Sequence, residues 1–303
     1  MIVVVQSIGQ IGNRLEQFSH LIAFARDHGV QIANPAFSLY SEFFEHTQHD
    51  LFCRYPSKSA SWVTPGMQRV GYYFFRVLAG LRLLSLFPRC EWIDQHWTSC
   101  EYNLGNPQFL KIVRNRKHVF LTGTWEHGYW QNYEAHLDAI RAHFRLVPAL
   151  RENIARHFAP IRQAGEIVVG VHIRQGDNST DAIRTDCFSS ADYLRVMRKI
   201  LGLFPGRRVV FLVCSNERQD AALFAGMTIF RGPGSFIEDM YILAECDYLV
   251  GAGQSSFSGW ASLMGQKPRY GLLHPDREIT LRDFVVCKGL NDRRTAAPAP
   301  EEK

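Results

Sequence analysis

The strongest constraint on the fold is a strand–loop–helix–strand unit at the start of the sequence. Residues 2–6 form an apolar run that predicts a buried strand, and a glycine-containing loop follows it. A helix is expected over 14–27, with apolar side chains on one face and Gly29 as its C-terminal cap, and the next strand over 30–33. Because a helix that connects two neighbouring strands makes them parallel, the chain is predicted to be an α/β protein.

A second block of the same kind fills the C-terminal half, whereas the aromatic-rich stretch 35–110 does not divide into clear elements. Its expected elements are strands at 167–173, 209–214, 228–230, 247–251 and 269–273, and helices at 148–164, 190–203, 236–246 and 256–264. We therefore expect two Rossmann-like domains that face each other across a cleft. The boundaries predicted from the sequence are 1–157, 158–290 and a disordered tail at 291–303.

Composition narrows the class of protein. Apolar residues make up 46% and charged residues 21%, as in ordinary globular proteins. The net charge of +5 is mild and comes without a long basic run, so a nucleic-acid partner is not expected. No apolar window is long enough to predict a transmembrane helix. The seven cysteines lack metal-binding spacing and indicate reduced thiols, which favours a cytoplasmic protein.

The segment 171–177, Val-His-Ile-Arg-Gln-Gly-Asp, carries the clearest chemistry. It lies where a buried strand gives way to a loop, the sheet edge at which open α/β folds bind ligands. His172 and Arg174 are two residues apart on an extended strand and therefore point to the same side. A guanidinium fork and an imidazole together suit a diphosphate. The alternative is structural: a salt bridge between Arg174 and Asp177 at the end of the strand.

Other strand ends carry groups that could serve the same ligand. The loop before the first helix contains Gly12 and Asn13, where a glycine-rich backbone and a helix N-terminus favour an anion; it could equally be a tight turn. The segment 251–258 is a glycine- and serine-rich turn that opens a helix, and it suits either anion binding or simple helix capping. The polar residues after the strand at 209–214 could contact a base or a ribose, or cap a helix.

These segments, in this order, resemble the α-1,2-fucosyltransferases of glycosyltransferase family 11, within a superfamily that includes α-1,6- and protein O-fucosyltransferases. The family's N-terminal element appears as GQIGNRLEQF from Gly9 to Phe18, and its middle element as GYWQNY at 128–133. Its HxRRGD segment is matched at 172–177, and its late element runs from Glu238 through Cys246 to Trp260.

The resemblance implies a GT-B-like fold and GDP-β-L-fucose as the donor substrate. It implies inversion at the anomeric carbon, no cofactor and no metal, a glycan or lipid-linked oligosaccharide as acceptor, and galactose O-2 as the position linked. The N-terminal domain would be on the acceptor side, and the C-terminal domain would bind the nucleotide sugar. Arg174 and His172 are the implied catalytic residues. The implied donor-binding residues are Gly12, Asn13, His172, Arg174, Ser215, Asn216, Asp239, Ser255, Ser256 and Phe257.

Direct displacement at the anomeric carbon needs a base for the proton of the acceptor hydroxyl. Asp177 is the first candidate, and Asp181, Asp186 and Glu126 follow it; the alternative for Asp177 is that it only orients Arg174.

The chain departs from the family pattern at three places. Gln175 replaces the second arginine of the HxRRGD segment, Ser-Asn-Glu at 215–217 replaces Ser-Asp-Asp, and Gly259 replaces the first tryptophan of a pair. Two alternatives to fucosyl transfer therefore stay open. One is the same fold with another nucleotide sugar, and the other is a catalytically silent nucleotide- or glycan-binding protein.

A last pattern concerns the stretch 69–89. Arg69, Arg76, Arg82 and Arg89 recur at spacings of seven, six and seven among aromatic and leucine residues, which predicts one basic helical face. The two interpretations are a helix packed on the first domain with solvated arginines, and a peripheral contact with anionic lipid at the inner face of a membrane.

Overall fold

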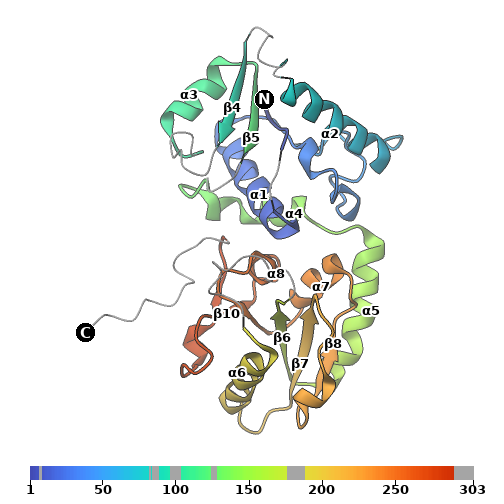
Figure 1. Ribbon diagram of the computed structural model, residues 1–303, viewed down its shortest axis with the longest axis vertical. Helices are drawn as coiled ribbons and strands as arrows, with labels where there is room; N and C mark the ends of the chain where they lie inside the picture. Colours follow the sequence, from blue (N-terminus) through green and yellow to red (C-terminus); the bar gives the residue numbers. More distant parts are fainter. Residues whose placement is uncertain are drawn as a thin grey trace, which may run out of the picture. The chain divides into compact units, whose positions relative to one another are not determined.

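The structure is a computed structural model that describes residues 1–6, 9–81, 83, 89–95, 104–123, 128–175 and 188–289. The chain divides into two compact units, Met1–Pro148 and Ala149–Lys303 (Figure 1). The boundary expected from the sequence, 157/158, falls inside the helix α5 (Pro148–Ala164). The tail at 291–303 lies outside the described residues.

The first unit contains a five-stranded sheet in the order β3-β2-β1-β5-β4. Its strands are β1 (Ile2–Val4), β2 (Ile32–Ala33), β3 (Arg54–Tyr55), β4 (Cys90–Gln95) and β5 (His118–Gly123). Its helices are α1 (Ile11–His28), α2 (Pro65–Gly80), α3 (Pro107–Asn115) and α4 (Leu137–His143), with short 3-10 turns at Pro35–Phe37, Ser41–Phe43 and Tyr133–His136. All pairs are parallel except β2 with β3, so the predicted parallel sheet is confirmed.

Alternation along β1 and β5 directs side chains to the two faces of this sheet. Val3, Val5 and Phe120 form a cluster with apolar side chains of α2 on one face. On the other face α1 packs against α3 through Phe24 and Phe109, whose ring centroids lie 5.5 Å apart. α1 ends as the sequence predicts, since Gly29 adopts the left-handed conformation with φ of 64°.

The predicted single helical face over 69–89 is wrong in its extent. Helix α2 begins after the cap of Thr64, whose side chain accepts from the Met67 N–H, and it ends at Gly80. Arg89 has a φ of 66° and directly precedes β4, which is held extended by its pairing with β5. Arg89 therefore cannot share a helical face with Arg69, and Arg82 lies outside the described residues.

The second unit contains a six-stranded sheet in the order β11-β10-β9-β6-β7-β8. Its strands are β6 (Ile167–Ile173), β7 (Val209–Ser215), β8 (Ile229–Arg231), β9 (Tyr248–Ala252), β10 (Pro268–Leu272) and β11 (Val285–Val286). Its helices are α5, α6 (Ser190–Leu203), α7 (Phe236–Leu243) and α8 (Ser256–Gly265), with 3-10 turns at Ala221–Phe224 and Leu281–Asp283. Only β11 runs antiparallel to its neighbour.

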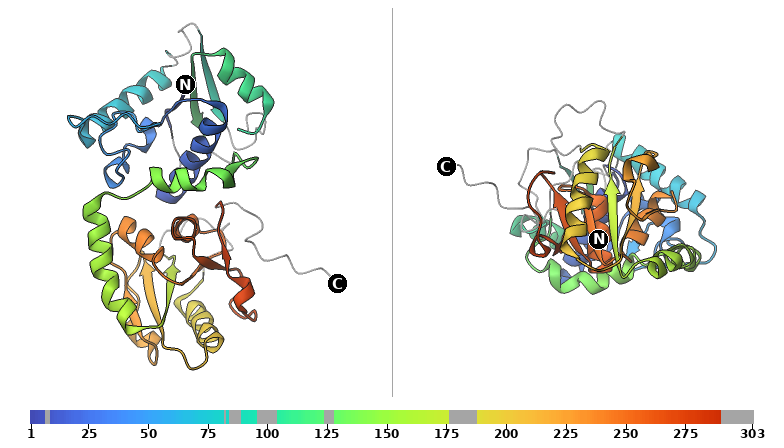
Figure 2. Two further views of the ribbon diagram at one scale, coloured as in Figure 1. Left: turned by 180° about the vertical axis from the view of Figure 1, so that it is seen from behind. Right: turned by 90° about the horizontal axis from the view of Figure 1, so that it is seen from below.

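The two faces of this sheet are covered by different helices (Figure 2). Val169, Val171 and Ile173 of β6 belong to a cluster with the buried side of α6. The intervening positions face α7: an added Cβ at Gly170 would lie 2.7 Å from Leu243 and 3.0 Å from Cys246. His172 continues this second row, so the strand end delivers it to the α7 and α8 side of the sheet.

Two parallel-rich sheets, each in its own unit, confirm the predicted GT-B-like α/β class. In the described part of the chain, no helix is long and apolar enough to cross a membrane.

Candidate functional site

The end of β6 brings three predicted residues into direct contact. His172 is buried, and its Nδ1 shares a hydrogen bond of 3.2 Å with Ser255 Oγ. Its ring also stacks on Phe257, with centroids 4.4 Å apart and planes inclined by 19°. Ser255 and Phe257 flank the start of α8, so the strand end and the helix start form one cluster.

This close approach requires the glycine at position 251. Gly251 pairs with His172 across β9 and β6, and a Cβ there would lie 2.3 Å from Ser258 Oγ. Ser255 caps α8, because its hydroxyl accepts from the Ser258 N–H at 3.4 Å. The helix starts at Ser256, half-buried next to Phe257. Unsatisfied N–H groups in a first turn favour an anion, so this capping is compatible with the predicted anion binding, which stays a prediction.

A buried guanidinium lies behind this turn and was missed by the sequence analysis. Arg269 of β10 is buried, and its Nε donates to Ser258 Oγ at 2.9 Å. Its Nη2 donates to the carbonyls of Ala252 and Gly253. Among the described residues no carboxylate pairs with it. Its charge is therefore held by neutral acceptors, which leaves positive potential next to the turn. The signal in the sequence was a charged residue inside an otherwise apolar strand.

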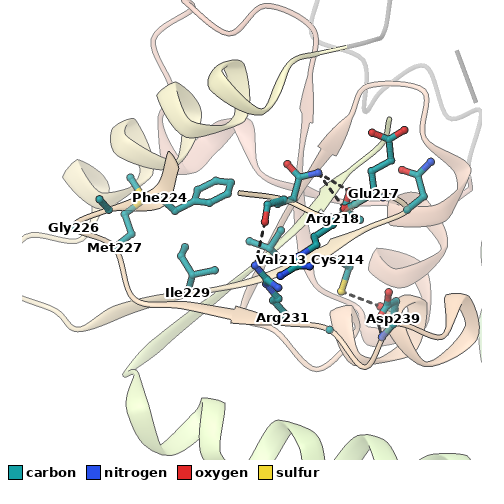
Figure 3. Close-up of a pocket in the computed structure, with 16 residues that line it drawn as sticks. Val213, Cys214, Glu217, Arg218, Phe224, Gly226, Met227, Ile229, Arg231 and Asp239 are labelled. Atoms are coloured by element: carbon teal, nitrogen blue, oxygen red, sulfur yellow. Dashed lines mark hydrogen bonds between the residues drawn. The ribbon is translucent and has the colours of Figure 1, made fainter. Parts of the chain in front are cut away.

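A cavity of ≈ 510 Å³ opens at the ends of β7 and β8 (Figure 3). Three of the predicted residues line it: Ser215, Asn216 and Asp239. Two cations that the sequence analysis did not single out, Arg218 and Arg231, line it as well. A volume of this size lies in the range of small-ligand sites, roughly 300–1,000 Å³.

Asp239 contributes a buried carboxylate to this cavity. It is 7% exposed, and its Oδ1 accepts from the Gly234 N–H at 3.0 Å. Burial raises the pKa of the Asp239 carboxyl above its ordinary value, while the Gly234 hydrogen bond acts in the opposite direction. Gly232 makes room for it, since a Cβ there would lie 2.3 Å from Asp239 Oδ1. A desolvated acceptor on a cavity wall suits a ligand that carries hydrogen-bond donors.

The His172 cluster and the cavity adjoin each other at the ends of the neighbouring strands β6 and β7. His172 pairs in register with Cys214 of β7, and Cys214 lines the cavity. The Cys214 thiol donates to the Asp239 backbone carbonyl at 3.8 Å. The second unit thus gathers six of the predicted residues at the carboxyl end of its sheet: His172, Ser215, Asn216, Asp239, Ser255 and Phe257.

Gln175, where the family pattern has an arginine, is fixed by a neutral hydrogen-bond network. Asn216 accepts from the Gln175 N–H at 2.8 Å and donates to its carbonyl oxygen. The Gln175 side chain donates to Ser190 Oγ at 2.9 Å and accepts from Gln219 Nε2 at 2.9 Å. Asn216 therefore has a structural role in addition to lining the cavity.

Of the predicted catalytic residues Arg174 and Asp177, the structure describes only the first. Arg174 is half-buried and directly precedes Gln175 at the end of β6. Asp177 lies outside the described residues, as do the alternative bases Asp181, Asp186 and Glu126. The assignment of a base therefore stays a prediction.

Gly12 and Asn13 lie in the first unit, in the first turn of α1. Gly12 is buried and Asn13 is exposed. Gly9 has a φ of 78°, and a Cβ there would lie 2.3 Å from Asn13 Nδ2, so the loop depends on a glycine at this position. Their assignment to the donor stays a prediction.

The middle element at 128–133 anchors the segment after β5 to α1. Tyr129 Oη donates to Asp27 at 2.6 Å, and Asn132 Nδ2 donates to the same carboxylate at 3.0 Å. The Tyr129 N–H donates to His20 Nδ1 at 3.0 Å, and burial lowers the pKa of His20 to about 4. These contacts give Tyr129 and Asn132 of this motif a structural role.

Within the described ranges no group of three or more His, Cys, Asp or Glu residues could hold a metal ion.

Solved structures with a similar fold include a fucosyltransferase and proteins in complex with GDP. A mutant of Arabidopsis thaliana FUT1 in complex with GDP is similar over 90% of this chain and 71% of that chain, with 13% identity and a TM-score of 0.58. NodZ, an α-1,6-fucosyltransferase soaked with GDP-fucose, is similar over 91% and 97%, with 16% identity and a TM-score of 0.52; NodZ comes from Bradyrhizobium. POFUT1 in complex with GDP covers 89% and 96%, with 12% identity and a TM-score of 0.51.

At these identities the similarity establishes the fold alone, which is the GT-B-like α/β fold. No curated protein matches the sequence. The model of glycosyl transferase family 11 matches residues 89–270, more than half of the chain. The protein belongs to glycosyl transferase family 11, which confirms the resemblance drawn from the motifs.

Proposed function

We propose that this protein transfers L-fucose from GDP-fucose to a hydroxyl of a glycan with inversion at the anomeric carbon. The acceptor position proposed is O-2 of galactose, in the synthesis of a surface polysaccharide or oligosaccharide. The observation that carries the proposal is the cavity at the ends of β7 and β8, with its buried Asp239, next to the His172–Ser255–Phe257 cluster.

The cavity suits the nucleoside. Guanine presents two neighbouring donors, N1–H and the N2 amino group, and a carboxylate can accept both. Asp239 is the buried acceptor in this cavity, and burial strengthens such a charge-assisted hydrogen bond. Adenine and uracil lack this pair of donors. Asp239 therefore supports a guanine nucleotide over other nucleotides.

The neighbouring cluster suits the diphosphate. Arg174 follows the strand end that carries His172, and the first turn of α8 offers backbone N–H groups beside Ser255. Arg269 adds buried positive charge behind the turn. Cys214, which lines the cavity, pairs in register with His172 of the neighbouring strand. One nucleotide could therefore place its nucleoside in the cavity and its diphosphate beside this turn, with both in the same unit.

The proposed step is a single displacement. A lone pair of the acceptor hydroxyl forms the bond to the anomeric carbon while the bond from that carbon to the β-phosphate oxygen breaks. The bonding electrons leave with GDP, and Arg174 and His172 stabilise the charge that develops there. The hydroxyl proton passes to a carboxylate, for which Asp177 is the candidate.

Two further facts support a GDP-sugar donor. The solved structures with this fold include FUT1 and POFUT1 in complex with GDP, and NodZ soaked with GDP-fucose. The family match covers the segment that carries His172, Arg174 and Asp239.

The test is a donor panel followed by a turnover assay. Thermal shifts with GDP, UDP and dTDP sugars report binding directly, and GDP-fucose should give the largest increase in melting temperature. Release of GDP with a galactose-terminated acceptor should then depend on Arg174, and Arg174→Ala should abolish it. Stabilisation by a UDP or dTDP sugar and not by GDP-fucose would overturn the donor assignment. The linkage is read from the product by NMR.

One observation favours a second candidate, a nucleotide-binding protein without transferase activity. Gln175 supplies no charge where the family pattern has a second arginine, and its side chain is engaged by Ser190 and Gln219. This candidate predicts that GDP binds and that no acceptor releases GDP from GDP-fucose. The same turnover assay therefore separates the two.

A further inference from the structure

Helix α2 presents an apolar face to solvent. Its inner side packs on the sheet of the first unit: Tyr72 is buried and Phe75 joins the cluster with Phe120. The opposite side carries exposed apolar residues, which we call the outer face of α2. These residues are Met67, Val70, Tyr73, Phe74, Val77 and, directly after the helix, Leu81.

The apolar side chains of this face are unusually exposed to solvent. Val70 is 70% exposed, Phe74 60%, Val77 59% and Leu81 63%. Their spacing of three and four residues places them on one stripe of the helix. A helix at the surface of a globular protein normally turns polar residues outward, and contiguous apolar surface of this kind marks a contact with a partner or a membrane.

Positive charge borders the outer face. Helix α2 contains no Asp or Glu, and Arg69 and Arg76 lie seven residues apart along one edge of the stripe. Arg76 lies over the Tyr72 ring at 5.9 Å, and Arg69 makes an exposed contact of 3.4 Å with Glu42. Exposed ion pairs of this type are weak, so Arg69 can still meet another anion.

More basic residues lie beyond the C-terminal end of α2. Leu78 and Ala79, in its last turns, pack in the same cluster as Cys90, the first residue of β4. Arg89 directly precedes Cys90, and its carbonyl accepts from the Lys117 N–H at 2.8 Å. Both Arg89 and Lys117 are exposed, each directly before the strand that follows it, β4 and β5.

We propose that α2 docks this protein on the surface of an anionic lipid bilayer. Aliphatic and aromatic side chains of the outer face would enter the headgroup boundary, and the bordering cations would meet the lipid phosphates. Tyr73 and Phe74 are of the residue types that favour this boundary. The proposal does not depend on the donor or on transferase activity.

The shape and size of the face favour a bilayer over a protein partner. One convex helix supplies six apolar side chains, whereas a stable protein interface uses about 20–30 residues on each side. A bilayer needs no complementary shape, and its negative surface potential complements Arg69 and Arg76 at the edge of the face.

The experiment is co-sedimentation of the full chain with vesicles. One set contains phosphatidylcholine alone, and the other contains phosphatidylcholine with phosphatidylglycerol, both at low and physiological salt. The test variant is Phe74→Glu with Val77→Glu. The matched control is Leu281→Glu with Val285→Glu, two exposed apolar residues of the second unit, 46% and 41% exposed. A second variant, Arg69→Gln with Arg76→Gln, tests the charges without touching the apolar residues.

We expect the protein to bind anionic vesicles. This binding should be weaker at physiological salt than at low salt, and weaker to phosphatidylcholine alone than to the anionic mixture. Phe74→Glu with Val77→Glu should lower the partition constant by roughly tenfold or more, because two apolar contacts become charges in the boundary. The arginine variant should lower it on anionic vesicles only, and the control should bind like the wild type. Melting temperatures of all variants confirm folding.

Three outcomes would overturn the proposal. The wild type could stay in the supernatant with anionic vesicles at low salt. The control could lose binding as much as the test variant. Light scattering could show a dimer without lipid that Phe74→Glu with Val77→Glu dissociates, which would make the outer face an interface between two copies.

Discussion

Replacing Asp239 by Asn tests the role of the cavity most sharply, because the change is nearly isosteric. The amide oxygen of Asn can still accept from the Gly234 N–H, which now bonds Asp239 Oδ1 at 3.0 Å. The variant therefore keeps the local structure and removes the charge. It also places an amide N–H₂ group, a donor, where the second carboxylate oxygen accepted.

The magnitude follows from the loss of one charge-assisted hydrogen bond to guanine. Such bonds contribute about 1.5–3 kcal/mol each, so we expect GDP affinity to fall by about 2 kcal/mol, or roughly 30-fold. The stability of the unliganded protein should change in the opposite direction. Burial raises the pKa of Asp239, and a raised pKa of an acid means that its ionised form costs stability at neutral pH. Asp239→Asn should therefore raise the melting temperature without ligand.

The pH dependence adds an independent signature. Free Asp239 takes up a proton at a pH above the ordinary value of 3.8, whereas guanine requires the carboxylate. Acidification through this raised pKa should weaken GDP binding to the wild type more than to Asp239→Asn. The comparison of the two proteins cancels the titration of GDP itself.

The assay is calorimetric titration of GDP into both proteins across pH, together with thermal melts. Glu245→Gln serves as the control, since it removes one exposed carboxylate just beyond α7. The reasoning is refuted if Asp239→Asn binds GDP like the wild type. It is also refuted if the variant loses affinity and melting temperature together, because that pattern reports a structural role for Asp239.

Three further predictions concern other residues of the two units. Gly232→Ala should lower the free energy of unfolding by about 1–3 kcal/mol and weaken GDP binding, because the new Cβ would lie 2.3 Å from Asp239 Oδ1; chemical denaturation and titration check both. Arg269→Met should cost about 2 kcal/mol in urea unfolding and weaken GDP binding, since buried carbonyls lose a charged donor; unchanged GDP affinity would exclude the electrostatic role. Burial alone would raise the pKa of Asp27, but hydrogen bonds, first that from Tyr129, lower it. The ionised Asp27 carboxylate therefore stabilises the fold above its unfolded pKa, and this stabilisation is lost as the pH falls through its lowered pKa. Asp27→Asn should flatten the acid limb of a plot of melting temperature against pH.

The sequence predicts the second unit well because its strands are continuous apolar runs with glycine or serine turns after them. The strand at 167–173, the helix at 190–203 and the helix at 148–164 match the structure to the residue. A strand buried on both faces is a continuous apolar run, so it can be recognised in the sequence without knowing which elements pack against it.

The stretch 35–110 was not predicted because its elements depend on partners that are distant in the sequence. In β4, Cys90 and Trp92 pack in the cluster with α2, but Glu91 interrupts the run and pairs with Arg116, which directly follows α3. The outer face of α2 is apolar as well, so no periodicity separates its buried side from its exposed side.

The same distinction between local pattern and distant partners applies to the candidate site. Which residue types end the strands could be predicted, since the carboxyl edge of a parallel sheet is fixed by topology. Their partners could not. Arg269 meets Ser258 from the next strand, and the cation is recognisable as part of the site only once β9 and β10 are paired.

Two departures from the family pattern turn out to be physically connected. Asn216 holds the backbone of Gln175 through both its N–H and its carbonyl, and these residues are 41 positions apart. The Gln175 side chain then joins Gln219, which also donates to Ser215 Oγ at 3.1 Å. An arginine at position 175 could not accept from the Gln219 amide, so the neutral residue and the amide at 216 belong to one network. The neutral residue at position 175 is therefore a built feature of this strand edge, and in the proposed function Arg174 and the buried Arg269 supply the positive charge for the leaving diphosphate.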